Sequence, residues 1–251
     1  MVGTNDIFSR TELLVGEKTM ALYRSARVIL FGVGGVGSWC AEGLIRSGIG
    51  HLTIVDADVV DVTNINRQLM ATTATVGRPK VEELRERLLT INPEADIVAR
   101  HEMFTPENAE DFDLNGFDYV IDAIDSLRCK LELILMATQK GLGFKFFSVM
   151  GAALKMDPTQ VRVSEFWEVD GCPLAAMLRR RMRRQKRFPG RKFKCVWSPE
   201  VLPNKGTAVS DENDGALFQK AQINGTMVHI TAIMGFYLSG LPLMDMSNSA
   251  K

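Results

Sequence analysis

The sequence predicts an α/β fold in which a mainly parallel, Rossmann-like sheet carries helices on both faces. Short apolar runs that suit buried strands alternate with longer segments whose apolar residues recur at helical spacing. A glycine-rich loop joins the first predicted strand to the next helix, and an acidic residue ends the second strand. The composition agrees, because a chain of 251 residues that is 46% hydrophobic, with 30 basic and 30 acidic side chains, is neither disordered nor collagen-like.

In the first part of the chain, predicted helices alternate with predicted strands. A helix is expected over residues 7–24, and the apolar run 27–31 then forms a short buried strand. The helix that follows the glycine-rich loop is expected to end at Gly48. A second strand covers 52–55, and residues 80–91 repeat apolar side chains at helical spacing before a proline.

The middle of the chain continues this alternation. Strands are expected at 97–98, 119–121 and 144–149, with a helix over about 130–140 between the last two. Strands that alternate with helices of this length form parallel neighbours, because each crossover helix returns the chain to the same edge of the sheet.

The C-terminal part has a different pattern. We expect an amphipathic strand near 161–163, a basic helix over 173–184 and irregular structure over 199–225. The chain therefore divides into a first domain, residues 1–155, and a C-terminal extension, residues 156–251. Because no low-complexity linker separates the two, the extension is expected to pack onto the first part as one unit.

The cysteines and the apolar segments bear on the cellular compartment. Four cysteines are scattered along the chain without a Cys-x-x-Cys pair, which predicts a reducing, cytoplasmic environment and no zinc. The N-terminus lacks the apolar stretch of a signal peptide. Residues 221–244 are uncharged, but their most apolar part, 227–241, is shorter than the roughly 20 residues that span a bilayer. A helix buried in the core or at a subunit interface is expected there.

The neutral total conceals an uneven distribution of charge. Residues 179–194 contain ten basic side chains and no acidic one, so the other 235 residues carry 20 basic and 30 acidic groups. Such a concentration of positive charge can act on a polyanion even though the whole chain is neutral.

The glycine-rich loop is the first candidate site. Its glycines leave room for backbone N–H groups and the positive end of a helix to approach phosphates; they are Gly32, Gly34, Gly35 and Gly37. Asp56 ends the next strand, at a distance that suits a ribose hydroxyl. Taken alone, this arrangement favours a nicotinamide cofactor, because NAD-dependent dehydrogenases have the same one.

Further residues favour ATP over a dinucleotide. Arg67 and Lys80 supply two cations where a triphosphate would lie, while Asn64 offers a neutral amide and Asp58 a second carboxylate. The segment Asp122-Ala-Ile-Asp-Ser126 follows a strand at the same edge of the sheet, where a carboxylate can hold magnesium against a phosphate.

Taken in order, these motifs resemble the ubiquitin-activating-type adenylating superfamily, over about residues 7–155. The motifs that carry the resemblance are GVGGVGS from Gly32, DADVV from Asp56, TNINRQ from Thr63, VGRPK from Val76 and DAIDS from Asp122. A narrower resemblance, to the tRNA threonylcarbamoyladenosine dehydratases, reaches residue 200. It is carried by Phe8–Leu13 with Gly16–Lys18, Thr63–Gln68, Asp157–Gln160, Pro173–Ala176 and Cys195–Glu200.

This resemblance implies an ATP-dependent dehydration of threonylcarbamoyladenosine in tRNA to its cyclic form. A carboxylate is a poor acyl donor, and its transfer to the α-phosphate of ATP creates an acyl adenylate from which the neighbouring ureido group can displace AMP. The alternative within the superfamily is adenylation of the C-terminus of a ubiquitin-like sulfur-carrier protein. Two alternatives belong to other functional classes. One is a non-catalytic, nucleotide-gated tRNA-binding protein, and the other is a nicotinamide-dependent dehydrogenase.

The resemblance also implies roles for individual residues. Gly34 and Asp56 hold the nucleotide, whereas Asn64, Arg67 and Lys80 bind and polarise its phosphates. A sulfur-transfer protein is a candidate partner beside the tRNA.

Two further positions concern the metal and the dimer. The resemblance implies that Asp125 carries magnesium, with Ser126 adjacent to it. Superfamily members are homodimers in which an N-terminal arginine reaches the partner's ATP, and Arg10 matches that position.

Cys195 is a candidate acceptor, because some superfamily members form thioesters on a cysteine. The neighbouring Lys192 and Lys194 are expected to lower the pKa of its thiol. A buried structural thiol is the alternative.

With this resemblance, the basic helix is expected to contact tRNA. An apolar stripe is expected to dock it on the core, formed by Leu174, Met177, Leu178 and Met182. The cations expected to face tRNA phosphates are Arg179, Arg180, Arg183, Arg184, Lys186 and Arg187.

Overall fold

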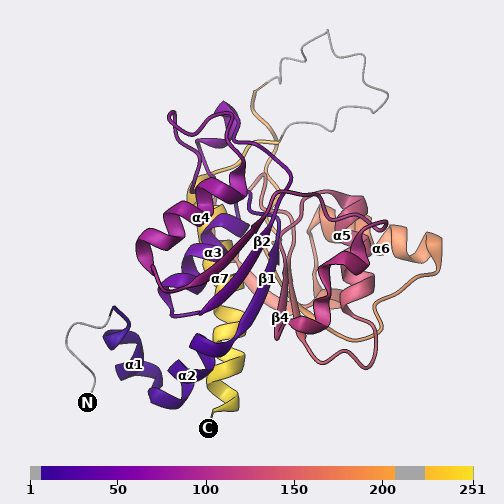
Figure 1. The fold of residues 1–251 in the computed structure, drawn as a ribbon. Helices are drawn as coiled ribbons and strands as arrows, with labels where there is room; N and C mark the ends of the chain where they lie inside the picture. Colours follow the sequence, from indigo (N-terminus) through magenta and orange to yellow (C-terminus); the bar gives the residue numbers. More distant parts are fainter. Residues whose placement is uncertain (1–6, 207–223, 251) are drawn as a thin grey trace.

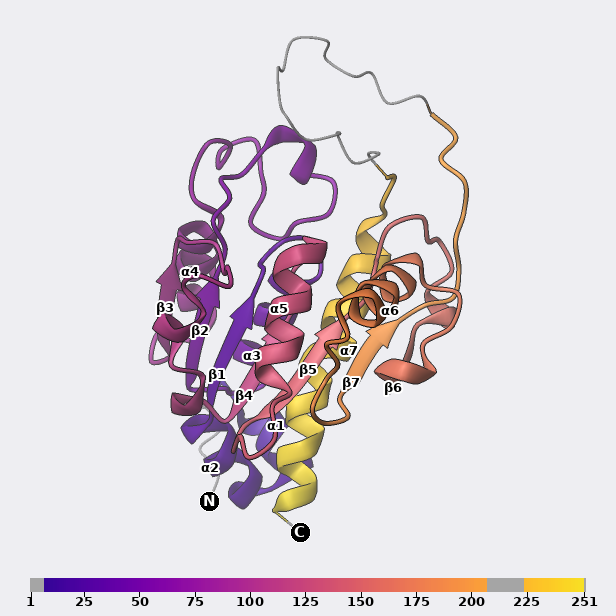
Figure 2. The same cartoon turned by 90° about the vertical axis from the view of Figure 1, so that its right-hand side faces the viewer.

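The computed structural model describes residues 7–206 and 224–250. The irregular structure expected over 199–225 therefore lies partly outside the described residues. Figures 1 and 2 show one central sheet with helices on both of its faces, and the helices α1 (Ser9–Val15) and α2 (Glu17–Ser25) lie at the same end of the molecule as the C-terminal end of α7 (Val228–Ser249).

A seven-stranded sheet forms the centre of the fold. Its strands are β1 (Arg27–Phe31), β2 (His51–Val55), β3 (Asp96–Arg100), β4 (Tyr119–Asp122), β5 (Lys145–Val149), β6 (Arg162–Glu165) and β7 (Lys194–Trp197). They lie in the order β3-β2-β1-β4-β5-β7-β6, and every neighbouring pair is parallel except β7 with β6. The predicted fold class, an α/β Rossmann-like sheet that is mainly parallel, is confirmed.

Helices cover both faces of this sheet (Figures 1 and 2). They are α1 (Ser9–Val15), α2 (Glu17–Ser25), α3 (Gly37–Arg46), α4 (Lys80–Ile91), α5 (Leu127–Ala137), α6 (Pro173–Gln185) and α7 (Val228–Ser249). One hydrophobic cluster contains residues of α2, α3, α4 and α7, and a second contains residues of α5 and α6. Each side chain fully buried in such a cluster contributes about 1.5–3 kcal/mol to folding.

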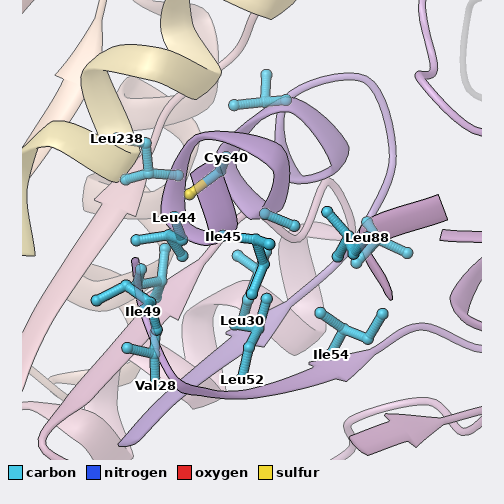
Figure 3. Packing of buried hydrophobic residues seen from close by; sticks show 14 of the residues in the cluster. Val28, Leu30, Cys40, Leu44, Ile45, Ile49, Leu52, Ile54, Leu88 and Leu238 are labelled. Atoms are coloured by element: carbon cyan, nitrogen blue, oxygen red, sulfur yellow. The ribbon is translucent and has the colours of Figure 1, made fainter. Parts of the chain in front are cut away.

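The packing of α3 on the sheet explains why the glycine-rich loop is held firmly. Cys40 and Leu44 of α3 lie over Leu30 of β1 and Leu52 of β2, and Leu238 of α7 closes the cluster (Figure 3). All five side chains are at most 1% exposed. The loop between β1 and α3 is therefore fixed at both of its ends.

Two glycines allow α7 to lie directly against α3. A Cβ atom on Gly43 would stand 2.5 Å from the Ser239 hydroxyl oxygen, and one on Gly235 would stand 2.6 Å from the carbonyl oxygen of Val36. The contact pairs advance together along the two helices, so α3 and α7 run in the same direction. Their N-terminal ends, with the unpaired N–H groups of a helix start, lie at the same edge of the sheet.

The predicted elements agree with the structure most closely where the hydrophobic pattern is strong. The strand at 27–31 and the helix at 80–91 have the predicted bounds. The single helix predicted over 7–24 is wrong, because Gly16 adopts φ +82° and separates α1 from α2.

The strand β7 is absent from the predicted elements. It has four residues, immediately after a basic run, and its pattern is too short to distinguish from a loop. It pairs in parallel with β5 and antiparallel with β6, so the sheet continues through the C-terminal part of the chain.

No helix in the described part of the chain has the length and apolar character needed to cross a membrane. The uncharged segment 227–241 lies almost entirely in α7, where Ile230, Met234 and Leu238 are fully buried.

Candidate active site

The strand order places a topological switch point at the carboxyl ends of β1 and β4, which is where open α/β sheets form their ligand-binding crevice. The chain leaves β1 toward one side of the sheet and β4 toward the other, and ligands bind at such a switch point in open α/β sheets. Gly32 follows β1 with φ +84°, and a Cβ atom on it would stand 2.6 Å from the carbonyl oxygen of Ala123, which follows β4. The two loops that line the crevice are therefore in direct contact.

The four glycines of the loop have different surroundings. A Cβ on Gly37 would collide with the carbonyl oxygen of Gly32, so the fold itself requires this glycine. A Cβ on Gly35 would stand 3.1 Å from the methyl carbon of Thr231 on α7. Beside Gly34 the nearest atom is the Gln68 amide nitrogen at 3.8 Å, which leaves ordinary space for a methyl group. Only Gly34 is thus unexplained by contacts within the chain.

Asp56 joins the glycine-rich loop to the end of β2. Its carboxylate accepts hydrogen bonds from the N–H of Val33 at 2.8 Å and from the N–H of Asp58 at 2.9 Å. Burial raises the pKa of Asp56, and this effect outweighs the opposing effects of the two N–H donors and of the charge of Lys80. The carboxylate lies at the end of β2, where a ribose site was expected.

Lys80 places a buried cation beside this carboxylate. Its side chain is 6% exposed, and Nζ donates to the Asp58 carboxylate at 2.7 Å. Asp58 itself is 64% exposed, so the pair consists of a buried ammonium and a solvated carboxylate. Lys80 begins α4, and its own N–H donates to the carbonyl of Asp58 at 3.0 Å, which fixes the base of the side chain.

The segment that contains Asn64 and Arg67 lies against the glycine-rich loop. Trp39 of α3 donates from its indole nitrogen to the Arg67 carbonyl at 3.1 Å. Ser38 donates to the Gly34 carbonyl at 2.7 Å and accepts from the N–H of Leu69 at 3.2 Å. These bonds hold the segment that contains Asn64 and Arg67 against α3 and the glycine-rich loop.

The side chains of this segment are held in different ways. Asn64 is 8% exposed and accepts from the N–H of Asp61 at 3.2 Å, within a capping box that closes the short 3-10 helix Val62–Asn64. The Arg67 guanidinium donates to the Thr63 carbonyl at 2.9 Å and to the Asn66 side chain at 2.8 Å. Both Arg67 hydrogen bonds are exposed to solvent, so a ligand can replace them at small cost.

Gln68 is a further candidate site residue, which was not predicted from the sequence. Its side chain is 6% exposed, and its Oε1 atom has no hydrogen-bond partner among the described residues. An unpaired buried oxygen costs about 1–3 kcal/mol unless something else satisfies it. The amide nitrogen, rather than Oε1, is the Gln68 atom that lies next to Gly34, 3.8 Å from where a Cβ atom would stand. The sequence feature that could have indicated Gln68 is its place directly after Arg67, at the end of the TNINRQ motif.

The loop after β4 carries Asp125 and Ser126, both exposed. It is anchored from below by Asp122, whose carboxylate accepts from the Ile124 N–H at 3.0 Å and the Ser148 hydroxyl at 2.6 Å. Lys130 completes this network, with Nζ 2.7 Å from the Asp122 carboxylate and both side chains fully buried. The exposed Asp125 thus projects from a rigid support.

The expectation that nearby lysines lower the pKa of Cys195 is wrong. The side chain lies within the sheet on β7 and is completely buried, and this burial raises the pKa of the thiol above its ordinary value. Lys192 and Lys194 are exposed to solvent. A thiol that stays protonated and inaccessible is a poor nucleophile, so the structure favours the structural role.

Arg10 lies away from the crevice of its own chain. It is exposed on α1, and α1 lies at the opposite end of the molecule from the loops over residues 56–80 (Figure 1). Phe8 and Met20 pack against Gly48, at the amino edge of the sheet. Arg10 is therefore separated from the crevice of its own chain.

The basic helix differs from expectation at three positions. Arg179 is only partly exposed and donates to the carbonyls of Val169 at 2.7 Å and Phe166 at 3.2 Å, so the expectation that it is free in solvent is wrong. Met177, expected in the docking stripe, is 38% exposed, and Ala175 is buried instead.

Arg187 is also engaged within the chain. Its guanidinium forms two hydrogen bonds of 2.7 Å with the Glu132 carboxylate, which is 19% exposed. The remaining predicted tRNA-contact cations are exposed and have no side-chain partner among the described residues; they are Arg180, Arg183, Arg184 and Lys186.

Comparison with known proteins identifies the family. A model of the ThiF family matches residues 8–240. The chain belongs to the ThiF family. A tRNA threonylcarbamoyladenosine dehydratase of Bacillus subtilis is 35% identical over 242 residues, which cover 95% of this chain and 94% of the relative. The Escherichia coli protein of the same name is 40% identical over 200 residues, covering 78% and 74%.

Solved structures agree with this family membership. The crystal structure of the Escherichia coli dehydratase TcdA in complex with ATP covers 100% of this chain and 98% of its own, with a TM-score of 0.84 and 34% identity. The similarity to this ThiF family structure therefore includes the C-terminal strands and α7, in addition to the crevice. The family assignment drawn from the sequence motifs is confirmed.

Proposed function

We propose that this chain is an ATP-dependent tRNA threonylcarbamoyladenosine dehydratase that acts through an acyl adenylate. The observation that carries the proposal is the crevice at β1 and β4, where Asp56 binds the N–H of Val33 in the glycine-rich loop, Lys80 pairs with Asp58 nearby in the chain, and the Arg67 segment lies against α3. Similarity over nearly the full length to proteins of that name supports the substrate. A sulfur-carrier adenylyltransferase is the alternative activity of the same crevice.

In the proposed reaction, the threonine carboxylate of the nucleoside attacks the α-phosphate of ATP and releases pyrophosphate. An atom of the neighbouring ureido group then attacks the acyl carbon, a proton leaves and AMP departs, so that the ring closes with the net loss of one water. No enzyme nucleophile is needed, because the attacking group already belongs to the substrate. The chain supplies orientation and positive charge.

The residues of the crevice suit these tasks. The Asp56 carboxylate can accept from a ribose hydroxyl, Lys80 and Arg67 can bind the phosphates, and the Gln68 amide nitrogen lies beside Gly34 as a candidate donor. Because Lys80 is buried, its charge is screened less by water than that of an exposed lysine.

Magnesium fits the exposed carboxylate of Asp125, with Ser126 beside it. No group of three or more His, Cys, Asp or Glu side chains in residues 7–206 and 224–250 forms a metal cage. Magnesium bound through one carboxylate and substrate phosphates does not require such a cage, and when bound it would neutralise phosphate charge.

The partners follow from the proposed activity. The tRNA substrate implies a cytoplasmic protein. Arg10 is proposed to reach the nucleotide of the partner copy in a homodimer, since it lies far from the crevice of its own chain. A sulfur-transfer protein remains a candidate partner.

A nucleoside assay tests the proposal. The enzyme is incubated with ATP, magnesium and tRNA that contains threonylcarbamoyladenosine, and the digested nucleosides are examined by mass spectrometry. We expect loss of one water, together with AMP and pyrophosphate. An unchanged nucleoside, combined with pyrophosphate exchange that depends on a ubiquitin-like carrier, would establish the alternative instead.

Gly34→Ala is expected to separate ligand binding from folding. A methyl group fits the free protein, so the free energy of unfolding should change by less than about 1 kcal/mol. The methyl group would obstruct the approach of a phosphate to the backbone, and the affinity for ATP should fall about tenfold or more, or about 1.4 kcal/mol. Calorimetric titration with ATP measures the affinity.

Two other glycines provide the comparison for this variant. Gly143→Ala, with no atom within 4 Å of the added carbon, should change neither quantity. Gly37→Ala should destabilise the fold, because the added carbon meets the Gly32 carbonyl. Wild-type ATP affinity in Gly34→Ala would exclude a phosphate at this glycine.

The raised pKa of Asp56 predicts the pH dependence of ATP binding. Because burial raises this pKa, the carboxylate becomes protonated at a higher pH than an ordinary aspartate and then no longer serves as an anionic acceptor. As the pH is lowered, ATP affinity should therefore begin to fall at a higher pH than it would if Asp56 had the ordinary pKa of an aspartate. Titrations across pH with the wild type and Asp56→Asn measure this, and the variant should lack the step.

The raised pKa of Asp56 also determines whether the free energy of unfolding rises or falls with pH. A carboxyl group whose pKa is raised on folding stabilises the folded chain most when it is protonated. Relative to Asp56→Asn, the wild type should thus lose stability as the pH rises through the interval between the ordinary and the raised pKa. The opposite slope would contradict the assignment of burial as the dominant cause.

A further inference from the structure

Two large aromatic side chains lie together on the surface near the end of α6. Trp167 is 40% exposed and Phe188 is 53% exposed. Their ring centroids are 6.3 Å apart, with an interplanar angle of 43°. Neither ring is buried in the core, so both rings are available to a ligand or partner.

The position of Trp167 is fixed from beneath. Its ring meets the edge of Phe166 at 5.3 Å, and Phe166 stacks on Phe193 at 5.0 Å, with both phenylalanines buried. The backbone of Trp167 is held by the Glu165 carboxylate, which accepts from its N–H at 2.8 Å. A rigid ring loses little conformational entropy when something stacks on it.

The surface around this aromatic pair is rich in unpaired cations. Arg183 lies one helical turn beyond Arg179, whose guanidinium stands 5.9 Å from the centre of the Phe166 ring. Arg184, Lys186 and Lys192 are also exposed and unpaired within the described residues.

Acidic side chains are present but are largely engaged. The Glu165 and Glu168 carboxylates accept backbone N–H groups of their own turn in a capping box. Glu132 is neutralised by the two bonds from Arg187. The exposed carboxylates of Glu168 and Asp170 keep their negative charge beside Trp167, whereas the unpaired cations lie at the end of α6 and in the residues next to Phe188.

We propose that Trp167 and Phe188 stack on unpaired bases of the RNA substrate, while Arg183, Arg184 and Lys186 bind its phosphates. Aromatic rings beside exposed cations are the combination with which proteins hold single-stranded nucleic acid. This inference rests on the proposed function, because it assigns a second contact to the same tRNA.

The position of the pair relative to the crevice fits a large substrate. The α6 helix starts near the carboxyl edge, where Gly171 packs against Pro199 and a Cβ atom on Gly151 would stand 3.6 Å from the Leu174 side chain. Its 13 residues then extend about 20 Å, and Figure 1 shows α6 projecting from the body of the molecule. A nucleoside in the crevice cannot reach the aromatic pair, whereas a tRNA can touch both.

Aromatic and basic variants distinguish stacking from charge. We measure the dissociation constant of fluorescently labelled tRNA for Trp167→Ala, Phe188→Ala and the double variant, each at several salt concentrations. Each single variant should weaken binding about tenfold, and the conservative Trp167→Phe should retain most of the affinity. The slope of log affinity against log salt should stay unchanged in these variants.

The charge variants should show the complementary behaviour. In the double variant Arg183→Ala/Arg184→Ala, the slope of log affinity against log salt concentration should become shallower. The expected change is about 0.9 for each phosphate that the protein no longer neutralises. Tyr237→Ala, an aromatic residue 46% exposed on α7, serves as the matched control and should bind tRNA like the wild type. If the stacked bases belong to the anticodon arm, an isolated anticodon stem-loop should lose affinity in Trp167→Ala and Phe188→Ala by the same factor as whole tRNA.

The failure of this inference can be distinguished from failure of the proposed function. The KM for tRNA should rise in the double aromatic variant, with the KM for ATP and the turnover at saturating tRNA unchanged. If the double variant dehydrates tRNA normally with an unaltered KM for tRNA, the two rings do not stack on the substrate, but the proposed function still holds. If the wild type binds tRNA through the two rings but does not dehydrate it, the stacking is supported and the proposed function is rejected. Loss of self-association in the double variant, with tRNA affinity intact, would reveal a protein interface instead.

Discussion

Lys80→Met should lower the rate of ATP-dependent dehydration by about 10²–10³-fold, the range found when one preorganised charge-stabilising donor is removed from an active site. Lys80 is the buried cation of the crevice, with a side chain that is 6% exposed. Methionine retains much of its length and apolar stem but carries no charge. Single-turnover measurement of AMP and of the cyclic nucleoside, at saturating ATP, gives the rate.

The free energy of unfolding should change little in this variant. Removal of Lys80 leaves Asp58 without a partner, but this carboxylate is 64% exposed and remains hydrated. Equilibrium unfolding in urea should therefore give a midpoint near that of the wild type. Lys140→Met, at an exposed lysine outside the crevice, controls for the loss of one positive charge. Wild-type turnover in Lys80→Met would remove this residue from the proposed mechanism.

Much of the crevice is predictable from sequence because its residues follow strand ends. Gly32 and Asp56 come directly after β1 and β2, and parallel strands bring such positions to one edge of the sheet. Lys80 is more distant in the sequence, but it begins a helix whose bounds the apolar spacing already defines. Local pattern and topology together were therefore sufficient for these positions.

Other features depend on tertiary contacts that no local pattern reports. The availability of Arg179 and Arg187 was misjudged, because their partners are carbonyls after β6 and a carboxylate on α5. The burial of Cys195 was equally hidden, since β7 is too short to be recognised as a strand. Gln68 illustrates the same limit, because an unpaired buried oxygen becomes evident only once its neighbours are placed.

The buried pair of Lys130 and Asp122 should show the largest effect on stability. Both side chains are fully buried, and Nζ lies 2.7 Å from the carboxylate. Lys130→Met leaves Asp122 buried without its cation, although the Ser148 hydroxyl and the Ile124 N–H remain as donors. Breaking a buried pair in this way costs about 3–5 kcal/mol. Urea unfolding of the wild type and the variant measures the loss.

A second substitution tests whether the loss comes from the uncompensated charge. Asp122→Asn in the Lys130→Met background removes that charge and should restore part of the stability, which a double-mutant cycle quantifies. Lys145→Met provides the exposed comparison, because Lys145 is 61% exposed, 3.9 Å from Asp245, and should lose less than about 1 kcal/mol. Equal losses for Lys130→Met and Lys145→Met would contradict the role of burial. Because the Asp122 loop packs directly on Gly32, Lys130→Met should also weaken ATP binding under conditions where the chain is still folded.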